Sequence, residues 1–78
     1  MSKRPPNADD LRVRQRLARQ WRLFRLENSL TQVMLASRTG ISLRTVRAVE
    51  NEEVTPTPRV RLAFAGFAAR FRGQAKVA

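Results

Sequence analysis

The sequence predicts an all-α fold, a compact bundle of about four helices in one small domain. Three observations predict it. Apolar residues recur at helical spacing, residues that cap helices precede these stretches, and turn-forming residues separate them, with no strand-like alternation. A chain of 78 residues is long enough for one such domain, which buries about 60–65% of its unfolded surface.

The first helix is expected after a basic arm. Residues 1–8 form this flexible arm because their adjacent prolines disfavour a helix. A carboxylate at Asp9 or Asp10 can cap free N–H groups, so the helix is expected to start there and to run to about Glu27. Asn28 and Ser29 are expected to end the helix, with Asn28 tolerating the left-handed conformation.

Two stripes are expected along this first helix. The apolar stripe recurs at helical spacing and predicts the side that packs into the core. It consists of Val13, Leu17, Trp21 and Phe24, broadened by Leu23 and Leu26. The second stripe, on another face, is basic and consists of Arg12, Arg16 and Arg19.

The centre of the chain predicts two short helices joined by a tight turn. They are expected over about 32–38 and about 43–51, with hydroxyl N-caps at Thr31 and Ser42. Gly40 takes positive φ at no steric cost, which permits a sharp turn. Two helices joined in this way form a helix-turn-helix, which can place its second helix in the DNA major groove. The residues expected to face inward are Val33, Leu35, Ala36, Val46 and Val49.

A last helix is expected after a loop over residues 52–57. Thr57 caps it, and Pro58 suits the first helical position because its missing N–H would be unpaired there. Gly73 is expected to end the helix and the domain of residues 9–73, leaving 74–78 as a C-terminal tail. Its apolar face consists of Val60, Phe64, Phe67, Ala68 and Phe71. The last two aromatics of this face belong either to the core or to a dimer interface.

The charge of the chain favours a polyanionic partner. Sixteen Lys and Arg residues against six Asp and Glu residues give a net charge of +10, and fourteen of the sixteen are arginine. Guanidinium groups match phosphate oxygens and guanine edges better than ammonium groups do. The alternative is a solvated basic surface that only aids solubility. Four arginines of the first helix are expected either to extend the contact with DNA or to be merely solvated. They are Arg12, Arg14, Arg16 and Arg19.

Residues that are missing exclude several classes of function. The chain has no cysteine, histidine or tyrosine, which removes disulfides, thiolate nucleophiles and the commonest general base and metal ligand. We therefore expect no enzyme, no cofactor, no metal and no small-molecule substrate. No apolar run approaches the roughly 20 residues of a membrane span, and no hydrophobic signal core follows the N-terminus. A cytoplasmic protein without a membrane partner is expected.

The segment from Arg25 to about Phe71 resembles the lambda-repressor/Cro-like (XRE-type) helix-turn-helix family. The residues that carry the resemblance, by type and spacing, are Leu30-Thr31-Gln32, Leu35-Ala36, Gly40-Ile41-Ser42, Thr45-Val46, Glu50-Asn51 and Pro56. The resemblance implies a domain that binds operator DNA, usually as a dimer, and regulates transcription. The chain departs from the family at Glu52 and Glu53, since a glycine commonly follows Glu-Asn there, and it leaves little sequence for the usual fifth helix.

The resemblance also implies roles for single residues. The positions that resemble base-reading ones are Leu43, Arg44 and Arg47. Those that resemble contacts to the DNA backbone are Gln32, Ser42, Thr45 and Arg59. A partly buried bridge between Arg25 and Glu50 is implied between the first and third helices. Simpler alternatives stay open: phosphate contacts for the two recognition arginines, a core or dimer contact for Leu43, plain capping for Ser42, and an exposed ion pair.

The function expected is a sequence-specific regulator that binds double-stranded DNA. As a homodimeric repressor it would insert residues 43–51 into the major groove of a palindromic operator. One alternative is non-specific packaging of nucleic acid, or RNA binding, by charge alone. Another is a basic amphipathic module for membranes or an acidic protein, which the capped turn argues against. Activation rather than repression, a restriction-modification controller and an antitoxin remain open within the first class.

Overall fold

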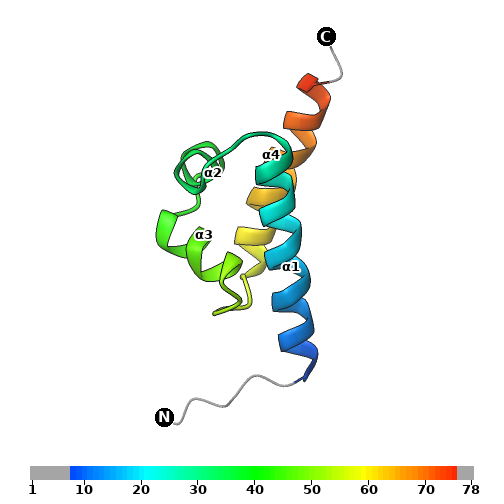
Figure 1. The fold of residues 1–78 in the computed structure, drawn as a ribbon, viewed down its shortest axis with the longest axis vertical. Helices are drawn as coiled ribbons and strands as arrows, with labels where there is room; N and C mark the ends of the chain where they lie inside the picture. Colours follow the sequence, from blue (N-terminus) through cyan, green and yellow to red (C-terminus); the bar gives the residue numbers. More distant parts are fainter. Residues whose placement is uncertain (1–7, 76–78) are drawn as a thin grey trace.

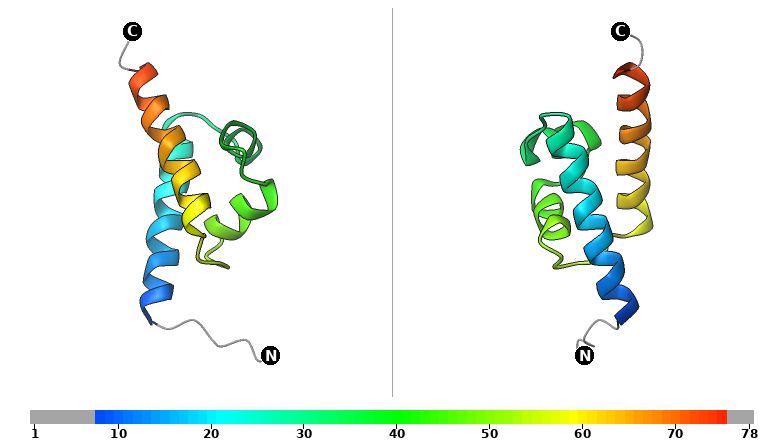
Figure 2. Two further views of the ribbon diagram at one scale, coloured as in Figure 1. Left: turned by 180° about the vertical axis from the view of Figure 1, so that it is seen from behind. Right: turned by 45° about the vertical axis from the view of Figure 1, so that its right-hand side comes forward.

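The structure, a computed structural model, describes residues 8–75 and the side chains of residues 8–71. Its helices are α1 (Ala8–Glu27), α2 (Gln32–Thr39), α3 (Leu43–Glu50) and α4 (Pro58–Ala75). The predicted all-α fold is confirmed. The long helices α1 and α4 run side by side in the same direction, and the short helices α2 and α3 lie to one side of them (Figure 1, Figure 2).

The expected ends of the domain differ in detail from those observed. The expected basic arm falls on residues outside the described part of the chain, except that Ala8 already belongs to α1. Gly73 does not end α4, which continues to Ala75, and the remainder of the expected tail also lies outside the described residues. Within those residues, no helix is both long and apolar enough to span a bilayer.

The helix α1 ends at the expected pair of residues, Asn28 and Ser29, but the left-handed residue of the pair is Ser29. Ser29 takes the left-handed conformation, with φ +56°. The N–H of Leu30 then donates to the carbonyl of Arg25 at 2.8 Å, the long bond of a Schellman motif. Asn28 instead donates its side-chain amide to the carbonyl of Phe24 at 2.8 Å. The prediction that Asn28 adopts the left-handed conformation is therefore wrong.

The central turn follows the local chemistry of its caps. Thr31 Oγ1 accepts from the N–H of Met34 at 3.0 Å, and Ser42 Oγ accepts from the N–H of Thr45 at 3.1 Å. Gly40 has φ +77° and turns the chain between α2 and α3. Because each cap satisfies an N–H that the helix itself leaves free, the two short helices start at defined residues.

Aromatic side chains join α1 to α4. The rings of Trp21 and Phe64 stack with centroids 4.8 Å apart. Phe24 packs edge-on against Phe64, Phe67 and Phe71 at 5.5, 5.9 and 5.8 Å. Such pairs stabilise by about 0.5–1.5 kcal/mol each beyond the area they bury. Phe67 is therefore part of the core of the single chain, and Phe71 is half-buried against that core.

Three residues that the sequence analysis placed in the core are exposed. Leu23, Leu26 and Val33 have exposed fractions of 51%, 62% and 58%. The inner sides of their helices are filled by other residues, among them Trp21 in α1 and Leu35 in α2, which are 1% and 0% exposed. Helical periodicity locates the centre of a buried stripe but not its width, which depends on where the neighbouring helices lie.

Candidate nucleic-acid interface

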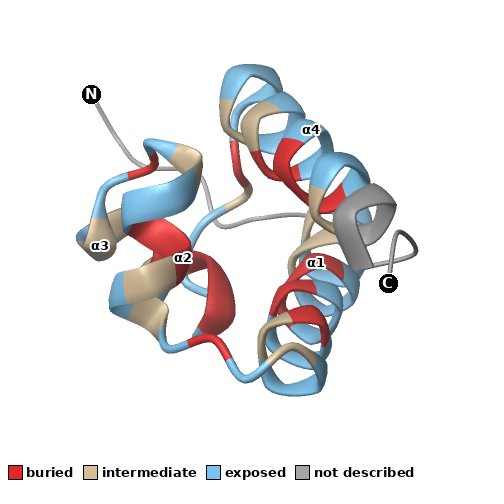
Figure 3. Cartoon of the chain, turned by 90° about the horizontal axis from the view of Figure 1, so that it is seen from above, coloured by how far each residue is buried: buried red, intermediate tan, exposed pale blue. Residues whose placement is uncertain are grey.

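The outer face of α3 presents free guanidinium groups. Arg44 and Arg47 are exposed, and Asn51 is exposed at the end of the same face, at spacing i, i+3 and i+7. The opposite side of α3 is buried, with Val46 and Val49 at 0% and 1% exposure. Figure 3 shows this division between the inner and outer sides of the helix. Among the described residues, neither arginine forms an ion pair.

Leu43 lies differently from the two arginines with which it was grouped. It is half-buried and packs against the hydrophobic core at the start of α3. Part of its side chain is therefore used to hold α3 in place, and only the rest is available to a ligand. Arg44 and Arg47 are the residues of this set whose side chains are exposed.

A buried ion pair holds the end of α3 against α1. Arg25 Nη2 donates to Glu50 Oε1 at 2.8 Å, and Arg25 Nε donates to Glu50 Oε2 at 2.9 Å, so the pair is bidentate. The two side chains are 15% and 3% exposed. The hydrogen bond from Arg25 to Glu50 raises the pKa of Arg25, against the opposing effect of burial. The predicted Arg25–Glu50 bridge is present and is not an exposed pair.

Further hydrogen bonds converge on Glu50. Gln32 Nε2 donates to Oε1 of Glu50 at 3.3 Å, which connects the first turn of α2 to the end of α3. Arg22 Nη2 donates to the carbonyl oxygen of Glu50, also at 3.3 Å. No buried side-chain nitrogen or oxygen among the described residues lacks a hydrogen-bond partner. Glu50 thereby fixes the orientation of α3 relative to both α1 and α2.

The two hydroxyl residues at the start of α3 are bonded to each other. Ser42 Oγ donates to Thr45 Oγ1 at 2.8 Å while it accepts from the N–H of Thr45. The hydroxyl proton of Ser42 is thus used within the helix. Among the described residues, the Thr45 hydroxyl accepts this bond and donates none, so its proton is available to an external oxygen.

The loop between α3 and α4 is also held in place. Glu52 takes φ +61°, and the N–H of Glu53 donates to the carbonyl of Ala48 at 2.9 Å, which makes a second Schellman motif. Arg14 Nε donates to Thr55 Oγ1 at 3.0 Å and ties the loop to α1. The loop thus adopts the turn in which glycine is favoured, although Glu52 occupies the position.

The start of α4 agrees with its expected cap. Thr57 Oγ1 accepts from the N–H of Val60 at 3.3 Å. Arg59 lies in the first turn of α4 and is exposed. It therefore presents a charge beside the loop, where a contact to the DNA backbone was expected.

Sequence reasoning did not find three residues of this region. Arg14 was expected either to extend the DNA footprint or to be solvated, and Arg22 was not considered. In the structure, Arg14 bonds to the loop and Arg22 bonds to the end of α3. Those partners are 41 and 28 residues away in the chain, so no local pattern indicates them. Asn51 was considered only for family resemblance, although its spacing from Arg44 would have placed it on the exposed face.

The comparison with protein families agrees with this geometry. Residues 22–65, more than half of the chain, match the family model described as Helix-turn-helix. The match begins within α1, contains the whole of α2 and α3, and ends within α4. No match to a curated protein or to a solved structure was found.

Proposed function

Because this chain belongs to the lambda-repressor-like helix-turn-helix family of DNA-binding transcription regulators, we propose that it is a sequence-specific repressor. Two copies would bind a palindromic operator, each inserting α3 into the major groove, with their recognition helices about 34 Å apart. Bound across a promoter, such a dimer would occlude RNA polymerase. The observation that carries the proposal is the exposed arginine face of α3 on a helix fixed through Glu50.

We assign base reading to Arg44 and Arg47. A guanidinium can donate two parallel hydrogen bonds to O6 and N7 of guanine, which discriminates by about 1–3 kcal/mol against a wrong base. Such discrimination needs a defined donor position, and the bonds to Glu50 supply it by fixing the helix. The exposed part of Leu43 would pack against a thymine methyl group.

Contacts to the DNA backbone are assigned to Gln32, Thr45 and Arg59, with Ser42 acting mainly as the cap. Gln32 uses one amide hydrogen on Glu50 and keeps the other for a phosphate oxygen. Thr45 keeps its hydroxyl proton because Ser42 donates to it. Arg59 adds a charge at the start of α4. These contacts would set the register of α3 without reading sequence.

The test begins with selection of bound duplexes from a random pool. A palindromic consensus with half-sites one helical turn apart is the expected result. Absence of any consensus would contradict sequence-specific binding and would favour the second candidate, non-specific binding of nucleic acid, which the net charge of +10 supports. A consensus without two-fold symmetry would contradict the dimer alone.

Arg44→Ala then tests base reading on the selected duplex. The variant should lose about ten-fold or more in affinity for that duplex, as a lost bidentate contact implies, with little change on a scrambled one. Arg70→Ala, at an exposed arginine of α4, is the matched control and should change neither affinity. Equal losses on both duplexes would show that Arg44 only contacts phosphate.

A further inference from the structure

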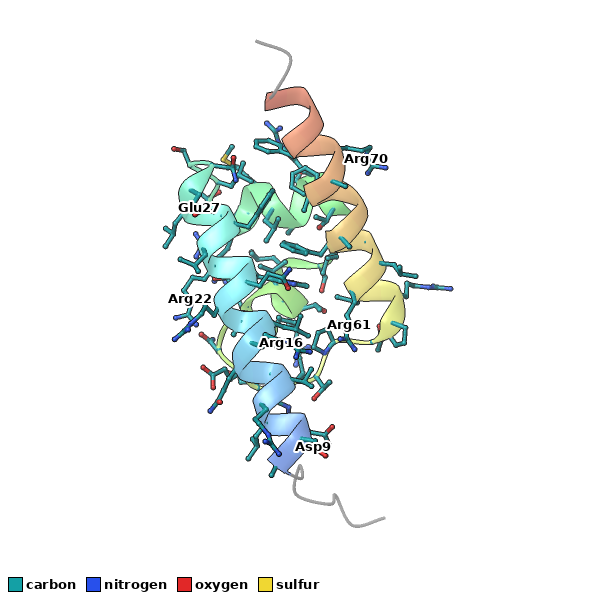
Figure 4. All side chains as sticks on the ribbon, turned by 90° about the vertical axis from the view of Figure 1, so that its right-hand side faces the viewer. Asp9, Arg16, Arg22, Glu27, Arg61 and Arg70 are labelled. Carbon is teal, nitrogen blue, oxygen red and sulfur yellow. The ribbon has the colours of Figure 1, made fainter. Side chains whose placement is uncertain are left out.

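The outer face of α1 carries an open groove that the proposed operator contact does not use. Arginine side chains and two exposed leucines line it. They are Arg12, Arg16, Arg19, Arg22, Leu23 and Leu26. Glu52 is the one acidic side chain among the described residues that line it. Figure 4 shows α1 in front of α2 and α3, with Arg22 projecting on the side away from α4. We call this surface the α1 groove.

The charges of the α1 groove are only partly neutralised. Arg12 pairs with Asp9 at 2.8 Å on an exposed surface, and such exposed ion pairs contribute little to stability. Arg22 donates to a carbonyl oxygen, which leaves its positive charge without a counter-charge. Among the described residues, Arg16 and Arg19 form no ion pair. The middle of the groove is therefore a concentration of positive charge that favours an anionic partner.

The leucines distinguish between anionic partners. Leu23 and Leu26 are 51% and 62% exposed and lie one turn apart, next to the arginines. A phosphate backbone would satisfy the guanidinium groups but would leave this apolar surface largely in water. A protein segment that combines carboxylates with apolar side chains would bury both. The combination thus fits an acidic protein better than a second contact to DNA.

A second copy of this chain does not fit the α1 groove. Two copies of α1 related by a two-fold axis at the middle of the stripe would bring Arg16 and Arg19 close to their own counterparts. Like charges in contact repel, and the chain has only six acidic residues against sixteen basic ones to offset them. This repulsion favours an occupant from a different protein.

We propose that the α1 groove docks an acidic amphipathic helix of another protein. The stripe from Arg12 to Leu26 is about 21 Å long, which corresponds to about four helical turns of the partner. Carboxylates of the partner face Arg16 and Arg19, and an apolar side chain packs between Leu23 and Leu26. This inference goes beyond the proposed DNA function and uses none of the residues assigned to DNA.

The test uses a labelled helical peptide of about 15 residues with glutamates and leucines on one face, and the full chain. A second peptide carries serine in place of each leucine. The wild-type chain should bind the leucine peptide about ten-fold more tightly. Leu23→Ser with Leu26→Ser should abolish that preference, whereas Leu62→Ser, at an exposed leucine of α4, should preserve it. Equal binding of the two peptides by the wild-type chain, which needs no variant, would overturn the proposal.

The arginines and DNA provide the second half of the test. The double variant Arg16→Ala with Arg19→Ala should bind the leucine peptide about ten-fold more weakly than the wild type does. Arg70→Ala should leave the affinity for this peptide unchanged. Peptide binding should persist in the presence of saturating duplex and in the Arg44→Ala variant. Displacement of the peptide by duplex would assign the groove to the DNA footprint and overturn the proposal. If Arg44→Ala loses operator binding and keeps peptide binding, the docking proposal is supported. The docking proposal and the DNA-binding proposal can therefore fail independently.

Discussion

Glu52 occupies a backbone conformation that side chains rarely adopt. Its φ of +61° places Cβ close to its own carbonyl oxygen, at a cost of roughly 1–2 kcal/mol relative to the right-handed form. Glycine at the same position has no Cβ and pays none of this cost, although it loses more freedom on folding. The Schellman hydrogen bonds around Glu52 fix the end of α3 and the start of the loop, and they thereby hold Glu52 in this conformation.

Glu52→Gly should therefore stabilise the protein. We expect the free energy of unfolding to rise by about 0.5–1 kcal/mol, which is a rise in Tm of several degrees for a domain of this size. Thermal melts followed by circular dichroism provide the measurement. Glu53→Gly is the control, because it removes the same charge at a neighbouring exposed residue without positive φ. A fall in Tm for Glu52→Gly equal to that of Glu53→Gly would contradict the argument.

The ion pair between Arg25 and Glu50 differs from the exposed pair between Arg12 and Asp9 because it is shielded from water. The pKa of Arg25 is raised by its hydrogen bond to Glu50. A group whose pKa is raised on folding contributes stability below its ordinary pKa and loses it only above the folded value. The ordinary pKa of arginine is already strongly alkaline. The contribution of Arg25 is thus constant through the neutral range.

Removal of one partner should cost much more than replacement of both. Glu50→Ala leaves the guanidinium of Arg25 buried without its counter-charge and should lower the free energy of unfolding by about 3 kcal/mol. Arg25→Met with Glu50→Leu leaves no unpaired charge and should lie within about 1 kcal/mol of the wild type. Urea denaturation measures both. The loss of stability should exceed any loss of base discrimination by the folded fraction, because Val46 and Val49 still hold α3 against the core. Equal destabilisation by the single and double variants would show that packing, not charge, dominates at this position.

At the scale of elements, the turn between α2 and α3 depends on one glycine. A Cβ built at Gly40 meets no atom within 4 Å, and neither does one built at Gly66 in the middle of α4. The two sites therefore differ in backbone conformation and not in available space. Gly40 has φ +77°, whereas Gly66 lies within a regular helix.

Substitution by alanine should have opposite effects at these two sites. Gly40→Ala forces a side chain into the left-handed region and should destabilise the protein by about 1 kcal/mol. Gly66→Ala should stabilise it by about 0.8–1 kcal/mol, since alanine is the better helix former. Comparative melts of the two variants are sufficient. A loss of stability in Gly66→Ala would show that α4 needs conformational freedom at this point, which the present geometry does not indicate.

The elements were predictable where local chemistry defines them. Thr31, Ser42 and Thr57 each cap the helix assigned to them, and Gly40 makes the predicted turn. Each of these features involves residues within a few positions in the chain, so the sequence contains the whole interaction. The left-handed residue after α1 was misassigned because Asn28 and Ser29 both suit a turn, and the choice depends on which carbonyl the asparagine side chain reaches.

Features that depend on packing were less predictable. Leu23 and Leu26 extend the apolar stripe of α1 in sequence, but no neighbouring helix covers them. The bonds of Arg14 and Arg22 depend on how the loop and α3 lie against α1. The partners of the Arg25–Glu50 pair lie 25 residues apart in the chain, and this pair was anticipated only through the family resemblance. The placement of Leu43 partly in the core likewise follows from tertiary packing.

For the whole molecule, the net charge of +10 determines how binding responds to salt. Charge of one sign disfavours association of two free copies, so dimerisation should be strongest on DNA, where phosphates offset the repulsion. Each phosphate that the protein neutralises releases counterions, and the logarithm of affinity then falls linearly with the logarithm of salt concentration. The slope therefore reports how many of the arginines contact the backbone.

Arg59→Ala should change this slope in a way that base-reading variants do not. Loss of one phosphate contact should reduce the magnitude of the slope by about 0.9. The affinity for the selected duplex and the affinity for a scrambled duplex should fall by equal factors. Arg70→Ala, which removes the same charge from the exposed face of α4, tests whether net charge alone produces the effect. Titrations at several salt concentrations give the slopes. Identical slopes for Arg59→Ala and Arg70→Ala would remove Arg59 from the backbone contacts, because only a residue held against phosphate releases a counterion when it binds.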